Sequence, residues 1–123
     1  MRHLFTTALL LLLISVLLAA CTAAPAVETA VTDEVLEQRA RELIDQLATG
    51  EYEAARQHFD RTMRTALSQS KLQEVWETIQ TQAGSYEKQG EARFENQQNY
   101  RIVYIATRFG LTALDTKVVF NDK

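Results

Sequence analysis

The chain has 123 residues, with 13 Lys and Arg against 16 Asp and Glu and a single cysteine. This length suits one small domain and is too short for two, and one cysteine leaves no pair for a disulfide within the chain. The formal net charge is −3, and no window gathers the basic stripe that neutralises phosphates, so nucleic acid is not an expected partner.

The N-terminal segment has the order of features found in a secretory signal. Arg2 supplies a positive end, residues 8–14 an apolar core, and Ala19 and Ala20 the small residues at a cleavage site. The run from Leu18 to Cys21 resembles a bacterial lipobox. The alternative is an uncleaved spanning helix over residues 4–20, which is close to the lower length limit of roughly 17 residues. Thr6, Thr7 and Ser15 interrupt that stretch and favour cleavage.

By this resemblance, residues 1–20 are a lipoprotein signal peptide and Cys21 becomes the lipidated first residue. Two acyl chains, such as palmitate, hold a protein firmly on a membrane. We therefore expect a protein of the bacterial cell envelope, anchored to a membrane on its extracytoplasmic side. Cleavage removes Arg2, so the mature part carries 12 basic and 16 acidic residues and a charge of −4. Residues 21–32, with Pro25 and many Ala and Thr, are predicted to form a flexible tether.

The next part of the chain has helical periodicity. Apolar residues between Leu36 and Ala48 fall on one face, with Thr32 or Asp33 as the cap and Gly50 as the stop. Residues 52–67 continue at helical spacing, either as one helix or as a helix broken near Asp60. A further helix starts about Ser68 or Ser70 and ends at Gly84.

After Gly84 the pattern alternates and becomes rich in β-branched and aromatic residues, which is typical of strands. We predict strands at 86–94, 100–109 and 112–120, with a turn at 96–99 and an irregularity at Gly90. Residues 33–123 are thus expected to be one α+β domain of three N-terminal helices on an antiparallel sheet. Both faces of strand 100–109 are apolar, and residues 121–123 look like the start of a turn. A second copy, a protein partner, or a missing last strand is expected to cover this sheet.

Four segments carry a family resemblance: LIDQLATGEYEAA at 43–55, FDRTM at 59–63, KLQEVW at 71–76 and VVF at 118–120. They resemble the bacterial domain of unknown function 3887. That family is similar to the nuclear transport factor 2-like superfamily, which implies a cone-shaped domain whose curved sheet wraps around helices and leaves a cavity. The resemblance also implies a further strand after Lys123. Such domains are found ahead of α/β-hydrolase domains or in short lipid-anchored proteins, and no G-x-S-x-G elbow occurs in this sequence.

The residues that could line such a cavity are Tyr52, Phe59, Trp76 and Tyr104. A cavity enzyme of the isomerase or dehydratase kind would use Tyr104 with Asp115, whose pKa burial would raise. His58 is expected in a solvated or capping role, because a triad needs a spatial arrangement that proximity in sequence does not give. In the mature part of the chain, one histidine and a lipidated cysteine leave too few ligands for a metal site, and no cofactor is expected.

The hypothesis favoured by the sequence is a non-enzymatic, lipid-anchored domain of the cell envelope. Its partners would be the membrane, a second copy or another protein on the sheet, or a small apolar ligand. The alternatives are the cavity enzyme and a detached N-terminal domain of a secreted α/β-hydrolase-like protein.

Overall fold

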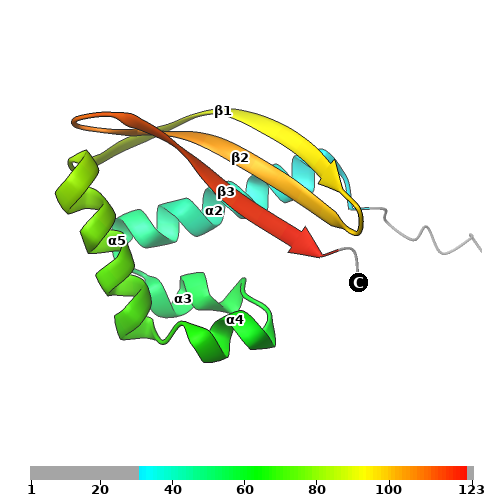
Figure 1. Cartoon of the computed structure of the whole chain (residues 1–123), viewed down its shortest axis with the longest axis horizontal. Coiled ribbons are helices and arrows are strands. Elements are labelled where there is room, and N and C mark those ends of the chain that lie inside the picture. Colours follow the sequence, from blue (N-terminus) through cyan, green and yellow to red (C-terminus); the bar gives the residue numbers. More distant parts are fainter. Residues whose placement is uncertain (1–30, 122–123) are drawn as a thin grey trace, which may run out of the picture. The chain divides into compact units, whose positions relative to one another are not determined.

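A computed structural model describes residues 31–121, which lie in one compact unit, Val31–Lys123. The proposed signal peptide, Cys21, most of the tether, Asp122 and Lys123 lie outside the described residues. The elements are α2 (Asp33–Thr49), α3 (Tyr52–Gln57), α4 (Arg61–Ala66), α5 (Gln69–Ala83), β1 (Tyr86–Gln97), β2 (Tyr100–Phe109) and β3 (Ala113–Asn121). All four helices lie on one side of the sheet, which arches over α2 (Figure 1). Among residues 31–121, no helix has the length and apolar character to cross a bilayer.

Local signals define the ends of α2. The Thr32 hydroxyl accepts a hydrogen bond from the backbone N–H of Val35 at 3.4 Å, and Asp33 and Glu34 lie in the first turn. The negative charges of both residues interact favourably with the positive end of the helix dipole. Gly50 ends the helix in the left-handed conformation, with φ of 81°, and its N–H bonds the carbonyls of Gln46 and Leu47. The predicted cap and stop of this helix are therefore confirmed.

The described residues hold four helices, so the expected count of three is wrong. The break falls at Asp60, whose carboxylate accepts a hydrogen bond from the N–H of Met63 at 2.7 Å and starts α4. Arg56 bridges the two short helices, because its guanidinium donates to the carbonyls of Leu67 at 2.8 Å and Arg64 at 3.1 Å. A capping carboxylate and an arginine that satisfies carbonyl groups make the corner stable.

The last helix, α5, begins after Ser68 rather than Ser70. The Ser68 hydroxyl accepts a hydrogen bond from the N–H of Lys71 at 3.2 Å. The helix ends at Ala83. Gly84 follows with φ of 90° and ψ of 174°, a backbone conformation that residues other than glycine rarely adopt. The chain then enters β1 directly.

The three strands form an antiparallel sheet in the order β1-β2-β3. The strand predicted at 86–94 extends to Gln97, so the turn is only Gln98 and Asn99. Gly90 lies in the register shift between Gln89 and Ala92. The irregularity that was predicted at Gly90 is therefore confirmed. β3 pairs with β2 without a shift from Ala113 to Asn121, one residue later than predicted at each end.

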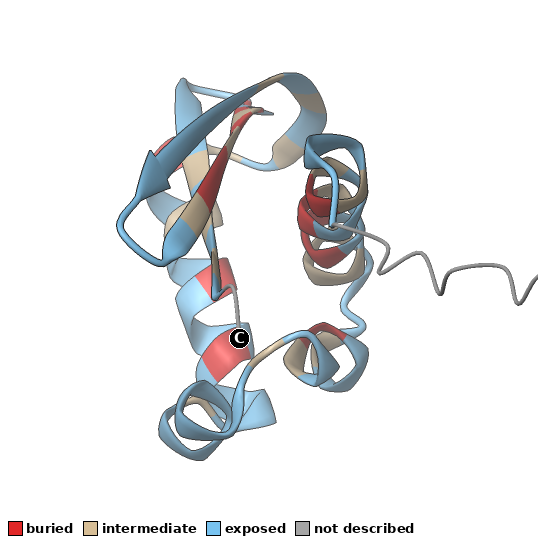
Figure 2. Ribbon diagram, turned by 90° about the vertical axis from the view of Figure 1, so that its right-hand side faces the viewer, coloured by how far each residue is buried: buried red, intermediate tan, exposed pale blue. Residues whose placement is uncertain are grey.

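The core lies between α2 and the inner face of the sheet. Val103 and Ile105 of β2 are fully buried against residues of α2, and Figure 2 shows the buried parts of the two elements facing each other. Two further clusters join α2, α3 and α5 to the sheet. The buried members of the three clusters are Leu36, Ala40, Ile44, Val103 and Ile105 in the first, Leu43, Ala55 and Leu72 in the second, and Trp76, Ala83 and Phe109 in the third.

The outer face of β2 is covered by its own chain. Ile102 is only 2% exposed, and Tyr104 lies under charged groups, with the Arg93 guanidinium 4.9 Å and the Lys117 ammonium 5.8 Å from its ring centre. Arg93 also forms an ion pair with Asp115 of β3 at 2.6 Å. The middle of the outer face of β2 is thus covered by neighbouring strands, while Tyr100 at its start is 46% exposed.

Candidate functional site

An apolar pocket of about 280 Å³ lies between α5, the end of α2 and β3. Its residues are Leu47, Leu72, Val75, Trp76, Ile79, Phe109, Leu114, Asp115, Thr116 and Lys117. This volume lies just below the size range of sites for drug-sized ligands, which starts at roughly 300 Å³. Its volume suits a short hydrocarbon chain or one large side chain.

The pocket lies where α5 faces β3, which is an edge strand of the sheet. β3 is the edge strand, so Val75 of α5 and Leu114 of β3 remain 40% and 42% exposed. Both belong to apolar faces of their elements, and neither is covered by another described strand. The pocket is therefore open along the edge of β3.

Trp76 forms the rigid end of the pocket and is 4% exposed. Its ring packs on Tyr86 and Phe109, with ring centres 6.0 Å and 5.8 Å away. Tilted aromatic pairs of this kind hold the indole in one orientation. The polar edge is equally fixed, because the Thr116 hydroxyl lies 2.9 Å from the hydroxyl of Thr107.

The four residues predicted to line a cavity divide between the two faces of the sheet. Trp76 lines the pocket, Tyr52 packs against its cluster, and Phe59 packs in the neighbouring cluster with Leu72. Tyr104 does not join them. It lies between Val103 and Ile105, which face the helices, so its side chain points to the outer face.

Sequence reasoning missed Val75 and Leu114 as pocket residues. Their helical and alternating spacing marked them as apolar, but core and pocket residues share that pattern. Only the position of α5 relative to the edge strand separates the two cases. No signal in the sequence could have found it.

Tyr104 and Asp115, the pair that a cavity enzyme would use, each bind a residue of β1. The Tyr104 hydroxyl donates to Glu95 at 3.1 Å on the outer face, and the Asp115 carboxylate is ion-paired with Arg93. Hydrogen bonds from Gln97 and then Tyr104 lower the pKa of Glu95 below its ordinary value of 4.5. These groups form a polar network that links β1, β2 and β3 on the outer face of the sheet.

The other polar candidates have local structural partners. His58 is exposed, and its Nε2 lies 3.0 Å from Oε1 of Gln46. Asp60 and Ser68 cap helices, so neither is directed at the histidine. Within residues 31–121, no three His, Cys, Asp or Glu side chains are grouped so that they could hold a metal ion.

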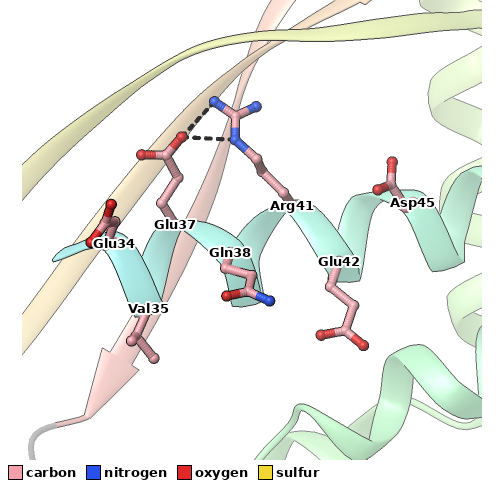
Figure 3. A pocket seen from close by; sticks show the side chains of 7 residues that line it. All are labelled: Glu34, Val35, Glu37, Gln38, Arg41, Glu42 and Asp45. Carbon is pink, nitrogen blue, oxygen red and sulfur yellow. Dashed lines mark hydrogen bonds and ion pairs between the residues drawn. The ribbon is translucent and has the colours of Figure 1, made fainter. Parts of the chain in front are cut away.

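A larger hollow of about 740 Å³ lies over the exposed face of α2 (Figure 3). Its described lining residues all belong to this helix, and they are Glu34, Val35, Glu37, Gln38, Arg41, Glu42 and Asp45. Glu37 and Arg41 form an ion pair along the helix at 2.7 Å. Arg41 also donates to the carbonyl of Gly90 at 2.9 Å, which ties α2 to the irregular part of β1. This surface is a solvated helix face with a structural arginine.

The fold and the pocket together define a small α+β domain in which helices and an open-edged antiparallel sheet enclose an apolar hollow. A family profile described as "Protein of unknown function (DUF3887)" matches residues 40–123. The chain belongs to this family, as the sequence resemblance predicted. Neither the curated proteins nor the solved structures contain a match to the chain.

Proposed function

We propose that this protein is a lipid-anchored, extracytoplasmic binding domain that takes a small apolar ligand between α5 and β3. The observation that carries the binding role is the open apolar pocket itself, with Trp76 as its rigid end and Val75 as its exposed wall. The lipobox-like run ending at Cys21 supports the anchor. A curved sheet over helices with a hollow between them supports a cone-shaped, nuclear transport factor 2-like fold.

The anchor is tested by growing cells with radiolabelled palmitate and isolating the protein. We expect label in the wild-type chain and none in the Cys21→Ser variant. Mass spectrometry of the N-terminal peptide should show a diacylated cysteine at position 21. An unmodified chain that begins at Met1 would refute lipidation.

Ligand binding is tested through Trp76, the only tryptophan in the chain. Because Trp76 lines the pocket, a short bromoalkane such as 1-bromohexane should quench its fluorescence saturably in the full-length protein. Val75→Glu puts a charge in the wall and should abolish the saturable component. Leu111→Glu is the matched control, since Leu111 is 77% exposed and does not line the pocket. Equal quenching in both variants would show that the probe does not use the pocket.

A protein strand is a second candidate occupant of the same region. β3 is a regular edge strand of nine residues without a register shift, and such edges accept added strands. Light scattering of the protein over a range of concentrations tests the case of a second copy. A mass that stays monomeric at all concentrations would leave the small ligand as the better proposal.

A further inference from the structure

The two edges of the sheet differ in how well they could receive another strand. β1 and β3 are the edge strands, with β2 between them (Figure 1). The pairing of β1 with β2 shifts register at residues 86–88 and again at 89–92, and Arg41 of α2 donates a hydrogen bond to the carbonyl of Gly90 in the second shift. The strand, YEKQGEARFENQ, is also rich in charge. Irregular pairing and charged side chains protect an edge against strand addition.

β3 has a regular edge. It pairs with β2 without a register shift along its whole length, and no other strand within residues 31–121 pairs with it. Its charged residues are Asp115 and Lys117 alone. Leu114 and Val119 are 42% and 51% exposed. A regular edge strand that displays apolar side chains is suited to receive another strand.

The pairing of β3 with β2 assigns the side chains of β3 to the two faces of the sheet. Thr116 pairs with Ile105, which is buried against α2, so Thr116 faces the helices. Side chains alternate along a strand, and the helix-facing residues are therefore Leu114, Thr116 and Val118. The outer-face residues are Ala113, Asp115, Lys117 and Val119. A strand that continues the sheet must place residues of the same face opposite each other.

A second copy of β3 satisfies the charged residues in one symmetric register. When two identical antiparallel strands pair about a two-fold axis, one residue lies opposite its own copy. If that residue is Thr116, Asp115 of each copy lies opposite Lys117 of the other. An axis at Lys117 would place two lysines opposite each other, and an axis at Asp115 would place two aspartates. Opposite charges across a strand pair are favourable and like charges are unfavourable, so the sequence of β3 selects the register about Thr116.

The same register covers the exposed apolar residues of β3. Leu114 lies opposite Val118 of the second copy on the helix-facing side, and Val119 lies opposite Ala113 on the outer side. The Cβ atoms of opposite residues in antiparallel strands are about 4.5–5.5 Å apart, so these side chains make contact. Residues 114–117, which line the pocket, lie at the centre of the pairing. The second strand therefore runs along the open side of the pocket.

Asp115 and Lys117 are both accessible to a second copy. Arg93 binds the Oδ2 atom of Asp115 at 2.6 Å, while the Asp115 side chain is still 49% exposed. Its other oxygen, Oδ1, can accept a hydrogen bond from an ammonium group. Lys117 is exposed, and its long flexible side chain can move its charge from the Tyr104 ring toward the edge.

We propose that two copies of this protein pair through their β3 strands, antiparallel and in register about Thr116, and so join their three-stranded sheets into one. The inference rests on the strand site proposed above and names its occupant. The outer edges of the joined sheet are the two β1 strands. Because these edges are irregular and charged, the assembly ends at a dimer and does not grow into a fibre.

The test exchanges the charges that the register places opposite each other. Full-length copies with two different affinity tags are co-expressed, solubilised in nonionic detergent and isolated through one tag, and the amount of the second tag measures association. Asp115→Lys paired with itself has only lysines at both contacts, and Lys117→Asp paired with itself has only aspartates. Each should reduce association by about tenfold or more. One copy of each variant restores opposite charges at both contacts and should return association to within about twofold of the wild type.

The controls separate a specific contact from a general effect of charge or folding. All variants share the wild-type N-terminal segment, so copies that merely share a micelle give the same background in each. Glu91→Lys and Lys88→Asp make the same changes of charge at exposed positions on β1, and they should leave association unchanged. A folding defect in the Asp115→Lys chain cannot be repaired by the Lys117→Asp chain unless the two positions meet.

A disulfide provides a second measurement that leaves these charges in place. A cysteine at the axis lies opposite its own copy with Cα atoms about 4.5–5.5 Å apart, which is within the range of a disulfide. Thr116→Cys should therefore form a covalent dimer on mild oxidation. Ala113→Cys is the matched control, because Ala113 is more exposed but would lie about 20 Å from its own copy. Cys21 is present in both variants, so the difference between them reports position 116.

The outcomes distinguish this inference from the proposed ligand pocket. Wild-type copies that co-purify no better than either charge variant with itself would overturn pairing with a second copy, and β3 would then be left for a strand of another protein or of the same chain. If wild-type copies associate but the mixed variants do not recover, or if Ala113→Cys cross-links as well as Thr116→Cys, the register is wrong and the inference is refuted. The fluorescence test with 1-bromohexane decides the ligand pocket separately in each case.

Discussion

Replacing Gly84 by alanine should be the most damaging small substitution in the domain. Gly84 joins α5 to β1, and the β2–β3 turn packs directly on it: the N–H of Leu111 donates to the carbonyl of Ala83 and the N–H of Gly110 to that of Ser85, both at 2.9 Å. A Cβ at position 84 would lie 2.8 Å from the backbone nitrogen of Leu111 and 3.0 Å from Gly110. Both contacts are with backbone, which cannot rotate away.

Two costs add in the Gly84→Ala variant. The conformation at φ of 90° and ψ of 174° is nearly restricted to glycine and costs about 1–3 kcal/mol for another residue. Relieving the contact with the turn adds about 1–3 kcal/mol, as for overpacking elsewhere. We expect the free energy of unfolding to fall by about 2–6 kcal/mol, and Tm to fall by roughly 4–8 °C for each kcal/mol.

Gly50→Ala is the matched control, because Gly50 also has positive φ, at 81°, but its nearest neighbour is the Tyr52 side chain at 3.9 Å. This variant has only the left-handed backbone cost of about 1–2 kcal/mol. Urea unfolding of the full-length protein in nonionic detergent, followed by Trp76 fluorescence, measures both. If Gly84→Ala costs no more than Gly50→Ala, the reasoning about the turn contact is wrong.

Three further predictions concern local interactions. Gln98→Gly should raise the free energy of unfolding by about 0.5 kcal/mol, because Gln98 has φ of 53°; the same change at Asn99, whose φ is not positive, should lower it. Arg56→Lys keeps the charge but loses the two carbonyl contacts that join α3 to α4. The free energy of unfolding measured in urea should therefore fall by about 1–2 kcal/mol, and an unchanged value would contradict the bridging role. Since the pKa of Glu95 is lowered below 4.5 by Gln97 and Tyr104, its contribution to stability is present above pH 4.5 and is lost as pH falls through the lowered pKa. Titration by NMR should find that Tyr104→Phe moves this pKa up toward 4.5, and an unchanged value would refute the hydrogen bond.

The parts of the fold that could be predicted from the sequence are those decided within a few residues. Thr32 and Gly50 define the two ends of α2 through hydrogen bonds to residues three or four positions away. Both partners of each hydrogen bond are therefore close together in the sequence. β2 was predicted with its observed bounds, since its apolar run is long and ends at glycine.

The parts that could not be predicted depend on distant residues. The covering of Tyr104 requires Arg93 from one neighbouring strand and Lys117 from the other, and nothing near Tyr104 in the sequence indicates them. The helix break at Asp60 was left open because helical spacing continues across it, while Arg56 and Leu67 form the contact that stabilises the corner. The pocket depends on how α5 and β3 are placed relative to each other, and these two elements are far apart in the sequence.

The hydrogen bonds from Arg101 to Val31 and Asp33 have a mechanical consequence. A pull on the N-terminal side of the domain is applied at the start of α2 and passes through this arginine into β2. β2 is the central strand and is hydrogen-bonded to a strand on each side. The force is therefore distributed over two sets of interstrand hydrogen bonds and does not act on the first turn of α2 alone. Arg101→Ala should therefore lower the force at which the domain unfolds when pulled from its N-terminus, more than it lowers the resistance to urea.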